Sequence, residues 1–180
     1  QDVLQPLSSR IDRGAMVTVI HHGGYGYAAT SDLTLLGLRE AFGRAKSWAM
    51  VFSKHPVMDF SKIVMPSYIG KYKSPGSVTS KQPTRREIIS LLQAESATCR
   101  IDSRIVDWES SLWTTTINQF FLTSDGTDIE QQFNYVVPNL YVTANAGSDT
   151  QTRSFGGRCF CQQGDLSIFL DSGIIGSGSR

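Results

Sequence analysis

The sequence predicts an α+β fold, an antiparallel β-sheet meander with two amphipathic helices packed on one face. Three observations lead to this prediction. A hairpin pattern and a strongly periodic helix come first, a second capped helix follows a long connector, and alternating segments with turn signals fill the rest of the chain. Because the helices precede the strands instead of alternating with them, a sheet built from repeated βαβ units is not expected.

The first predicted element is a β-hairpin. Residues Ala15–His21 (AMVTVIH) are rich in β-branched side chains, which favour a strand. The pair Gly23-Gly24 marks a turn, and Tyr25–Ala29 continues as a second strand. We therefore expect the two segments to pair in antiparallel fashion across a short turn.

A long amphipathic helix follows the hairpin. Thr34 is one of several candidate N-caps, and His55-Pro56 marks the end because a proline disfavours helical backbone in the residue before it. Between them, apolar residues recur at intervals of three and four, the spacing of one helix face. We expect this stripe to form the core contact of the helix: Leu35, Leu38, Phe42, Ala45, Ala49 and Phe52.

The next two segments are a connector and a second helix. The connector Val57–Pro83 is rich in proline and lysine and has no periodicity, so a long loop is expected. Thr84 and Glu87 then form the Thr-x-x-Glu pattern of a capping box, in which each side chain accepts a hydrogen bond from the backbone of the other residue. A second amphipathic helix should begin there and end near Thr98.

The remaining segments predict strands joined by turns. Ile101–Trp108 and Leu112–Ile117 have strand character and are separated by the polar segment Glu109-Ser110-Ser111. The stretch Phe120–Ser154 follows as the spine of an antiparallel sheet. Within it, Asp125-Gly126 predicts a two-residue type I′ turn, because that turn needs positive φ at both central positions.

This spine contains the candidate binding residues. Thr127–Tyr135 alternates polar and apolar residues, so we expect its apolar set to meet the helices and its polar set to face away. A turn at Gly147-Ser148-Asp149 should return Thr152 and Arg153 beside this strand. Such a surface suits an extended peptide held by backbone hydrogen bonds, and a plain solvated sheet face is the alternative. The candidate peptide-facing residues are Thr127, Asp128, Glu130, Gln131, Thr152 and Arg153.

Length and composition limit the classes of function. The 180 residues suit a single domain spanning residues 1–180, and a net charge of +1 gives no electrostatic case for binding nucleic acid. No apolar run is long enough to cross a membrane. Three cysteines without framework spacing favour a reducing compartment. Cys159 and Cys161 could ligate a metal, as could His21-His22, but neither pair has a further ligand nearby, so we assign no catalytic or metal residue.

Two segments carry a resemblance to a known family. One is RGAMVTVIHHGGYGYAATSDLTLLGLREAFGRAKSWA at Arg13–Ala49, and the other is LTSDGTDIEQQF followed by TQTRSFGG, at Leu122–Phe133 and Thr150–Gly157. Their order and spacing resemble the amino-terminal half of the TldD/PmbA family, zinc metallopeptidases once called modulators of DNA gyrase. The resemblance extends over nearly the whole chain.

The resemblance implies a role and no catalytic residue. In that family a His-Glu-x-x-x-His helix and a cysteine hold zinc in the carboxy-terminal half, so this chain is expected to be a non-catalytic fragment, truncated at both ends and lacking a cofactor. Its expected partners are that peptidase domain, a second subunit in a cytoplasmic homo- or heterodimer, and unfolded peptide. No membrane is expected, and DNA binding is suggested only by the family's old name. The sequence leaves open whether the parent is the zinc-bearing subunit. The alternative is a stand-alone module that adds a peptide to a sheet edge.

Overall fold

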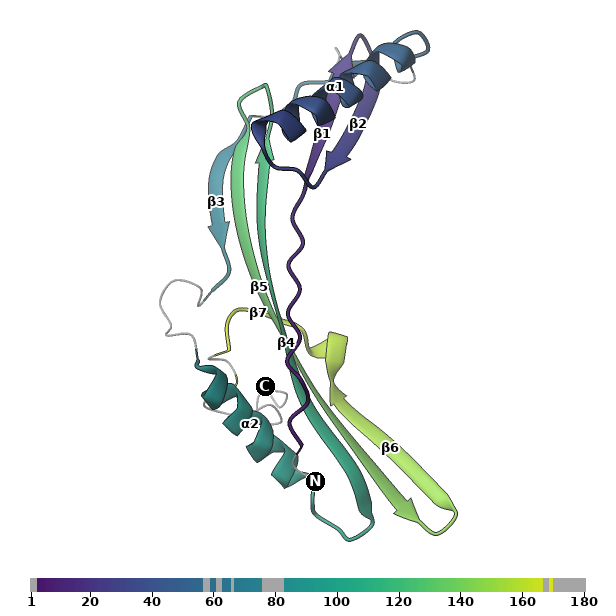
Figure 1. The fold of residues 1–180 in the computed structure, drawn as a ribbon, viewed down its shortest axis with the longest axis vertical. Coiled ribbons are helices and arrows are strands. Elements are labelled where there is room, and N and C mark those ends of the chain that lie inside the picture. The colour runs from purple at the N-terminus through teal and green to yellow at the C-terminus, as the bar shows by residue number, and fades with distance from the viewer. Residues whose placement is uncertain are drawn as a thin grey trace. The chain divides into compact units, whose positions relative to one another are not determined.

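The structure, a computed structural model, describes residues 3–56, 59–60, 63–65, 67–75, 83–166 and 169. The chain divides into two compact units, residues 3–66 and 67–180 (Figure 1). Among the described residues there are two sheets, each with its own helix, which confirms the α+β class. The expectation of a single domain stays a prediction.

The first unit begins with the expected hairpin. Strands β1 (Ala15–His21) and β2 (Gly24–Thr30) are antiparallel, with His21 opposite Gly24. The turn is His22-Gly23, one residue earlier than predicted. Both residues have positive φ, 46° and 81°, which is the signature of a type I′ turn. This turn matches the right-handed twist of the strands that it joins.

Helix α1 (Leu35–Phe52) starts and ends where the sequence predicts. The hydroxyl of Thr34 accepts a hydrogen bond from the N–H of Gly37 at 3.2 Å. Asp32 braces this start, because its carboxylate accepts from the N–H of Thr34 at 2.9 Å, and hydrogen bonding with Thr34 lowers the pKa of the carboxyl.

The face of α1 that packs on the hairpin confirms the predicted stripe only at Ala45 and Ala49. The buried residues are the small ones at every fourth position, Gly37, Ala41, Ala45 and Ala49. A Cβ at Gly26 would lie 2.1 Å from the carbonyl oxygen of Ala45, so only glycine permits this approach. The helix thus lies close against β2 along a row of small side chains, and the large predicted core residues Leu35, Phe42 and Phe52 are exposed.

The second unit is built on two long strands. Strands β4 (Ile105–Leu122) and β5 (Asp128–Ala146) pair in antiparallel fashion along their length. The other edge of β5 is shared by three short strands, first β3, then β7 and β6. The remaining elements are β3 (Ile69–Lys73), β6 (Asp149–Gly156), the 3₁₀ turn η2 (Gly157–Phe160) and β7 (Gln162–Gln163).

Three expectations for this unit need correction. The sheet is mixed, because β3 lies within the connector Val57–Pro83, which was expected to be a loop, and runs parallel to β5. Other parts of that connector are outside the described residues: 57–58, 61–62, 66 and 76–82. The two strands predicted around Glu109-Ser110-Ser111 are one strand, β4. The turn at Asp125-Gly126 is a five-residue loop, since Leu122 pairs with Asp128, and only Gly126 has positive φ, at 94°. The predicted turn at Gly147-Ser148-Asp149 is confirmed at Gly147-Ser148, and Asp149 already pairs with Ala146.

Helix α2 (Arg85–Thr98) covers the middle of this sheet and carries the predicted capping box. The hydroxyl of Ser110 on β4 donates to the carbonyl of Leu92 at 2.8 Å and lies 2.7 Å from the hydroxyl of Ser96. The core of the unit consists of Val136, Leu166 and Phe169, with Ile88, Leu91 and Leu112 packed against it. Among the described residues, no helix is both long and apolar enough to span a membrane.

Candidate functional site

The predicted binding strand lies inside the sheet instead of at its edge. Residues Asp128–Gln132 pair with Ile69–Lys73 on one side and with Asn118–Leu122 on the other. Both rows of backbone hydrogen-bonding groups are therefore used by neighbouring strands. A peptide could meet this segment only through its faces.

Thr127 has a structural place in the loop that enters this strand. Its side chain is 4% exposed, and its hydroxyl accepts a hydrogen bond from the N–H of Tyr68 at 3.3 Å. The N–H of Asp128 donates to the carbonyl of Tyr68 at 2.8 Å. Thr127 therefore joins the start of β5 to the start of β3 and presents almost no surface to a ligand.

Glu130 is engaged by a neighbouring strand. Its carboxylate lies 2.6 Å from the Nζ of Lys71 on β3. This hydrogen-bonded ion pair lowers the pKa of Glu130 and raises that of Lys71. Asp128 is exposed, whereas Gln131 is half-buried opposite Tyr72 on the other face. The negative charge of Glu130 is thus partly neutralised by Lys71.

Thr152 and Arg153 do not lie beside these residues. They pair with Thr143 and Val142, in the far half of β5. Eleven residues separate Gln131 from Val142, which corresponds to roughly 37 Å along a strand. The expected juxtaposition is wrong because β5 is long enough for β3 and β6 to occupy different parts of one edge.

The two faces of β5 also differ from the expectation. Ser110, which bonds to α2, is opposite Leu140, and alternation is unbroken from Asp107 onward. Asp128 and the other even-numbered polar residues therefore share the face that carries α2 further along the sheet. The opposite face holds an aromatic row, in which the rings of Tyr72 and Phe133 are 5.4 Å apart.

The described residues do not fit a metal. Among them, no three His, Cys, Asp or Glu side chains gather closely enough to hold an ion. His21 and His22 have ring centroids 4.3 Å apart but lack a third ligand among these residues. Cys159 and Cys161 are exposed free thiols. No reaction step through zinc can be built on this part of the chain.

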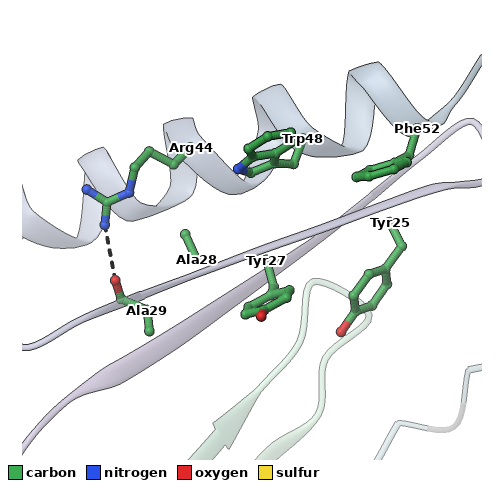
Figure 2. A pocket seen from close by; sticks show the side chains of 7 residues that line it. All are labelled: Tyr25, Tyr27, Ala28, Ala29, Arg44, Trp48 and Phe52. Carbon is green, nitrogen blue, oxygen red and sulfur yellow. Dashed lines mark hydrogen bonds between the residues drawn. The ribbon is translucent and has the colours of Figure 1, made fainter.

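A different site lies in the first unit, between the outer edge of β2 and α1. It is an open groove with a volume of about 680 Å³. Figure 2 shows the side chains that line it. Three helix residues spaced by four overhang it, Arg44, Trp48 and Phe52, and the rings of the last two are stacked 6.1 Å apart. The strand side of the groove is formed by Tyr25, Tyr27, Ala28 and Ala29.

Backbone groups that point away from β1 line the strand side of this groove, and among the described residues no strand pairs with this edge of β2. His21 and Gly24 close a two-residue turn and so form a hydrogen-bonded pair, and such pairs alternate with non-bonded pairs along an antiparallel ladder. The N–H and C=O groups of Tyr25, Tyr27 and Ala29 therefore point outward, away from β1. The guanidinium of Arg44 donates to the carbonyl of Ala29 at 3.1 Å, which agrees with an Ala29 carbonyl that points away from β1.

Sequence reasoning missed this groove, although part of its signal is local. The Arg44–Trp48–Phe52 row has helical spacing, and Gly24 and Gly26 alternate along β2. Glycine in a strand often marks the close approach of another backbone. Together these patterns indicate a helix lying close against an edge strand, with its large side chains displaced to the side.

The comparisons with known proteins match family models over both units. Residues 1–49 match the model described as PmbA/TldA metallopeptidase domain 1, and residues 78–176 match the PmbA/TldA metallopeptidase central domain. The search of curated proteins found no match. The groove between β2 and α1 lies largely in the first of these matched segments.

Proposed function

Because the chain belongs to the TldD/PmbA family, we propose that it is a non-catalytic amino-terminal part of a zinc metallopeptidase, which helps to enclose the proteolytic chamber and admit unfolded peptides. In this proposal, a carboxy-terminal peptidase domain of the same protein holds the zinc and cleaves the peptide bond. The subunits act in the cytoplasm as homo- or heterodimers.

The open edge of β2 is the observation that supports peptide binding. An extended chain can add to an exposed strand edge through main-chain hydrogen bonds, which select for extended backbone instead of a particular sequence. Folded proteins mostly protect their strand edges, so an extended segment with free backbone groups is offered mainly by unfolded chains. An edge of this kind would therefore favour unfolded substrates, as a protease that spares folded proteins requires.

The same edge would also serve a stand-alone peptide-binding module, because every group on it belongs to this chain. The coding sequence downstream of residue 180 distinguishes the two functions. A His-Glu-x-x-x-His segment there supports the peptidase, and its absence from the complete gene supports the module. Metal analysis of the dialysed 180-residue chain gives a second test. One tightly held zinc per chain would contradict the proposal that the carboxy-terminal domain holds the zinc.

Peptide binding is tested by NMR titration of the isotope-labelled 180-residue chain with an unstructured twelve-residue peptide. We expect amide shifts that cluster in β2. Shifts in Thr127–Gln132 and Thr150–Arg153 would instead indicate binding at the surface predicted from the sequence. The matched control is the same peptide held helical by a side-chain staple, which should give smaller shifts. Absence of shifts with the unstructured peptide at roughly 5 mM would exclude binding by this part of the protein.

A further inference from the structure

We propose that the groove between β2 and α1 selects extended peptides with an acidic residue followed, at every second position, by two apolar residues. This inference rests on the proposed function and specifies its substrate. The peptide would add to β2 as an antiparallel strand, with its acidic side chain at Arg44 and its apolar side chains at Trp48 and Phe52.

The spacing of the groove supports this pattern. Four residues of helix rise about 6.0 Å, and two residues of an extended strand advance about 6.8 Å. A peptide strand beside α1 therefore brings every second side chain level with one of the overhanging residues, Arg44, Trp48 and Phe52. Over three contacts the two repeats differ by less than 2 Å in total, which flexible side chains can absorb.

The alternation of side-chain direction along β2 determines which peptide residues face the helix. The side-chain direction at Gly24 and Gly26 is toward α1, because a Cβ at either position would clash with the helix backbone. Peptide residues opposite Gly24, Gly26 and Ala28 would thus point to the α1 side, and those opposite Tyr25 and Tyr27 would exchange backbone hydrogen bonds with the edge.

Charge and chain direction complete the pattern. Arg44 lies at the Ala29 end of the groove and Phe52 at the Tyr25 end, as Figure 2 shows. One guanidinium nitrogen of Arg44 bonds to the carbonyl of Ala29, and a guanidinium has further donors that a carboxylate can accept. Antiparallel pairing is slightly more stable than parallel pairing. The acidic residue therefore comes first along the peptide, and the apolar residues follow.

The occupant is a peptide of this composition and not a second copy of the chain edge. Residues 24–30 of this chain carry no acidic side chain that could meet Arg44 if two β2 edges paired. Trp48 and Phe52, half-exposed and stacked on each other, provide the apolar surface that valine or leucine side chains would cover. Their burial would add to the main-chain hydrogen bonds.

The test uses the 180-residue chain and the peptide acetyl-Gly-Ser-Asp-Ser-Val-Ser-Val-Ser-Gly-amide, with affinity measured by NMR titration. N-methylation of the serines that flank the first valine removes the N–H groups opposite Tyr27 and Tyr25 and should weaken binding at least about tenfold. N-methylation of the two valines leaves those contacts intact and should change the affinity much less. The peptide with the reversed order, Val-Ser-Val-Ser-Asp, should bind more weakly.

Variants of the chain test the charge. Arg44→Glu should weaken binding of the aspartate peptide at least about tenfold and favour the peptide with lysine in place of aspartate. Arg39→Glu is the matched control, because this substitution makes the same change in net charge. Arg39 is exposed on α1 and does not line the groove. It should leave both affinities nearly unchanged.

Equal affinity for all unstructured peptides would overturn the selectivity but leave the proposed function standing. Binding that survives N-methylation of both serines would overturn addition to β2. Shifts confined to residues 127–132 or 150–153 would move the site to the second unit. A concentration-dependent dimer that Ala29→Pro abolishes would assign the edge to a second copy.

Discussion

Each unit packs a threonine-capped helix on antiparallel strands, but α1 makes the contact with small residues and α2 with large apolar residues. Helix α1 buries Gly37 and three alanines and leaves most of its large apolar side chains exposed. In the second unit, Ile88 and Leu91 of α2 pack on a core that includes the fully buried Phe169. Both helices are amphipathic in sequence, so periodicity alone does not reveal which apolar residues are covered.

This difference separates two uses of apolar side chains. In the first unit, small residues let the backbones of α1 and β2 pack in direct contact. The large side chains of Trp48 and Phe52 are not needed for this contact and line a groove. Interdigitated large residues stabilise the second unit, at about 25 cal/mol per Å² of apolar surface removed from water. The groove is consequently found where the helix contact is made by glycine and alanine.

The largest expected effect comes from Gly26→Val in the first unit. A Cβ there would lie 2.1 Å from the Ala45 oxygen and 2.5 Å from the Ala49 nitrogen, so α1 must leave the hairpin. We expect loss of protected amides in β1, β2 and α1 during hydrogen exchange, with β5 as an internal reference. Gly43→Ala is the control, since nothing lies within 4 Å of that position, and it should stabilise α1 by up to about 1 kcal/mol. Retained protection in the Gly26 variant would refute the close-packed interface.

The next largest effect compares two phenylalanines. Phe169 is fully buried, so Phe169→Ala should cost about 3–5 kcal/mol of unfolding free energy. Phe52 is 53% exposed, and Phe52→Ala should cost less than about 1 kcal/mol while weakening peptide binding. Urea denaturation measures both. Equal losses would mean that Phe52 belongs to a core and not to a groove.

The sequence predicted what depends on local chemistry. Thr34 and Thr84 located both helix starts because capping needs only the next three residues, and Gly126 marked a position of positive φ. Strand β3 was missed because its residues are all exposed and its pairing depends on a segment 59 residues away, joined at Tyr68 and Thr127.

The groove was not predicted for a similar reason. Spacing shows that α1 is amphipathic, but the row that meets β2 is decided by glycines on another element. The predicted residues of the other candidate site were dispersed because β5 extends well beyond Tyr135, so Arg153 pairs with Val142. Strand length is set by partners on both edges, which a single alternating segment does not encode.

A moderate effect is expected at the loop before β5. Gly126 has φ of 94°, which is strained for a β-branched residue, and a Cβ there would lie 3.1 Å from the Oγ of Ser67. Gly126→Val should cost about 1–3 kcal/mol. Gly70→Val is the control, because the space around Gly70 on β3 is open, and it should change stability by less than about 0.5 kcal/mol. Similar denaturation midpoints for the two variants would contradict the loop geometry.

The smallest effect distinguishes the two helix caps. The Thr84 hydroxyl accepts from the N–H of Glu87 at 3.3 Å, and the Glu87 carboxylate accepts from the N–H of Thr84 at 2.6 Å. In α1 the residue at the equivalent position is Gly37, which cannot return the bond, and a side chain there would collide with Asp32. Both caps should therefore lose about 1 kcal/mol on Thr→Ala substitution.

Only the cap of α2 should show coupling between its two side chains. In a double-mutant cycle of Thr84→Ala and Glu87→Ala, we expect an interaction free energy of about 0.5 kcal/mol or more, because each substitution removes part of one reciprocal pair. Thr34→Ala combined with Arg39→Ala on α1 provides an uncoupled control, since no contact joins those two side chains among the hydrogen bonds of the described residues. Strict additivity at Thr84 and Glu87 would show that the two bonds act independently, and that the caps of the two units are equivalent.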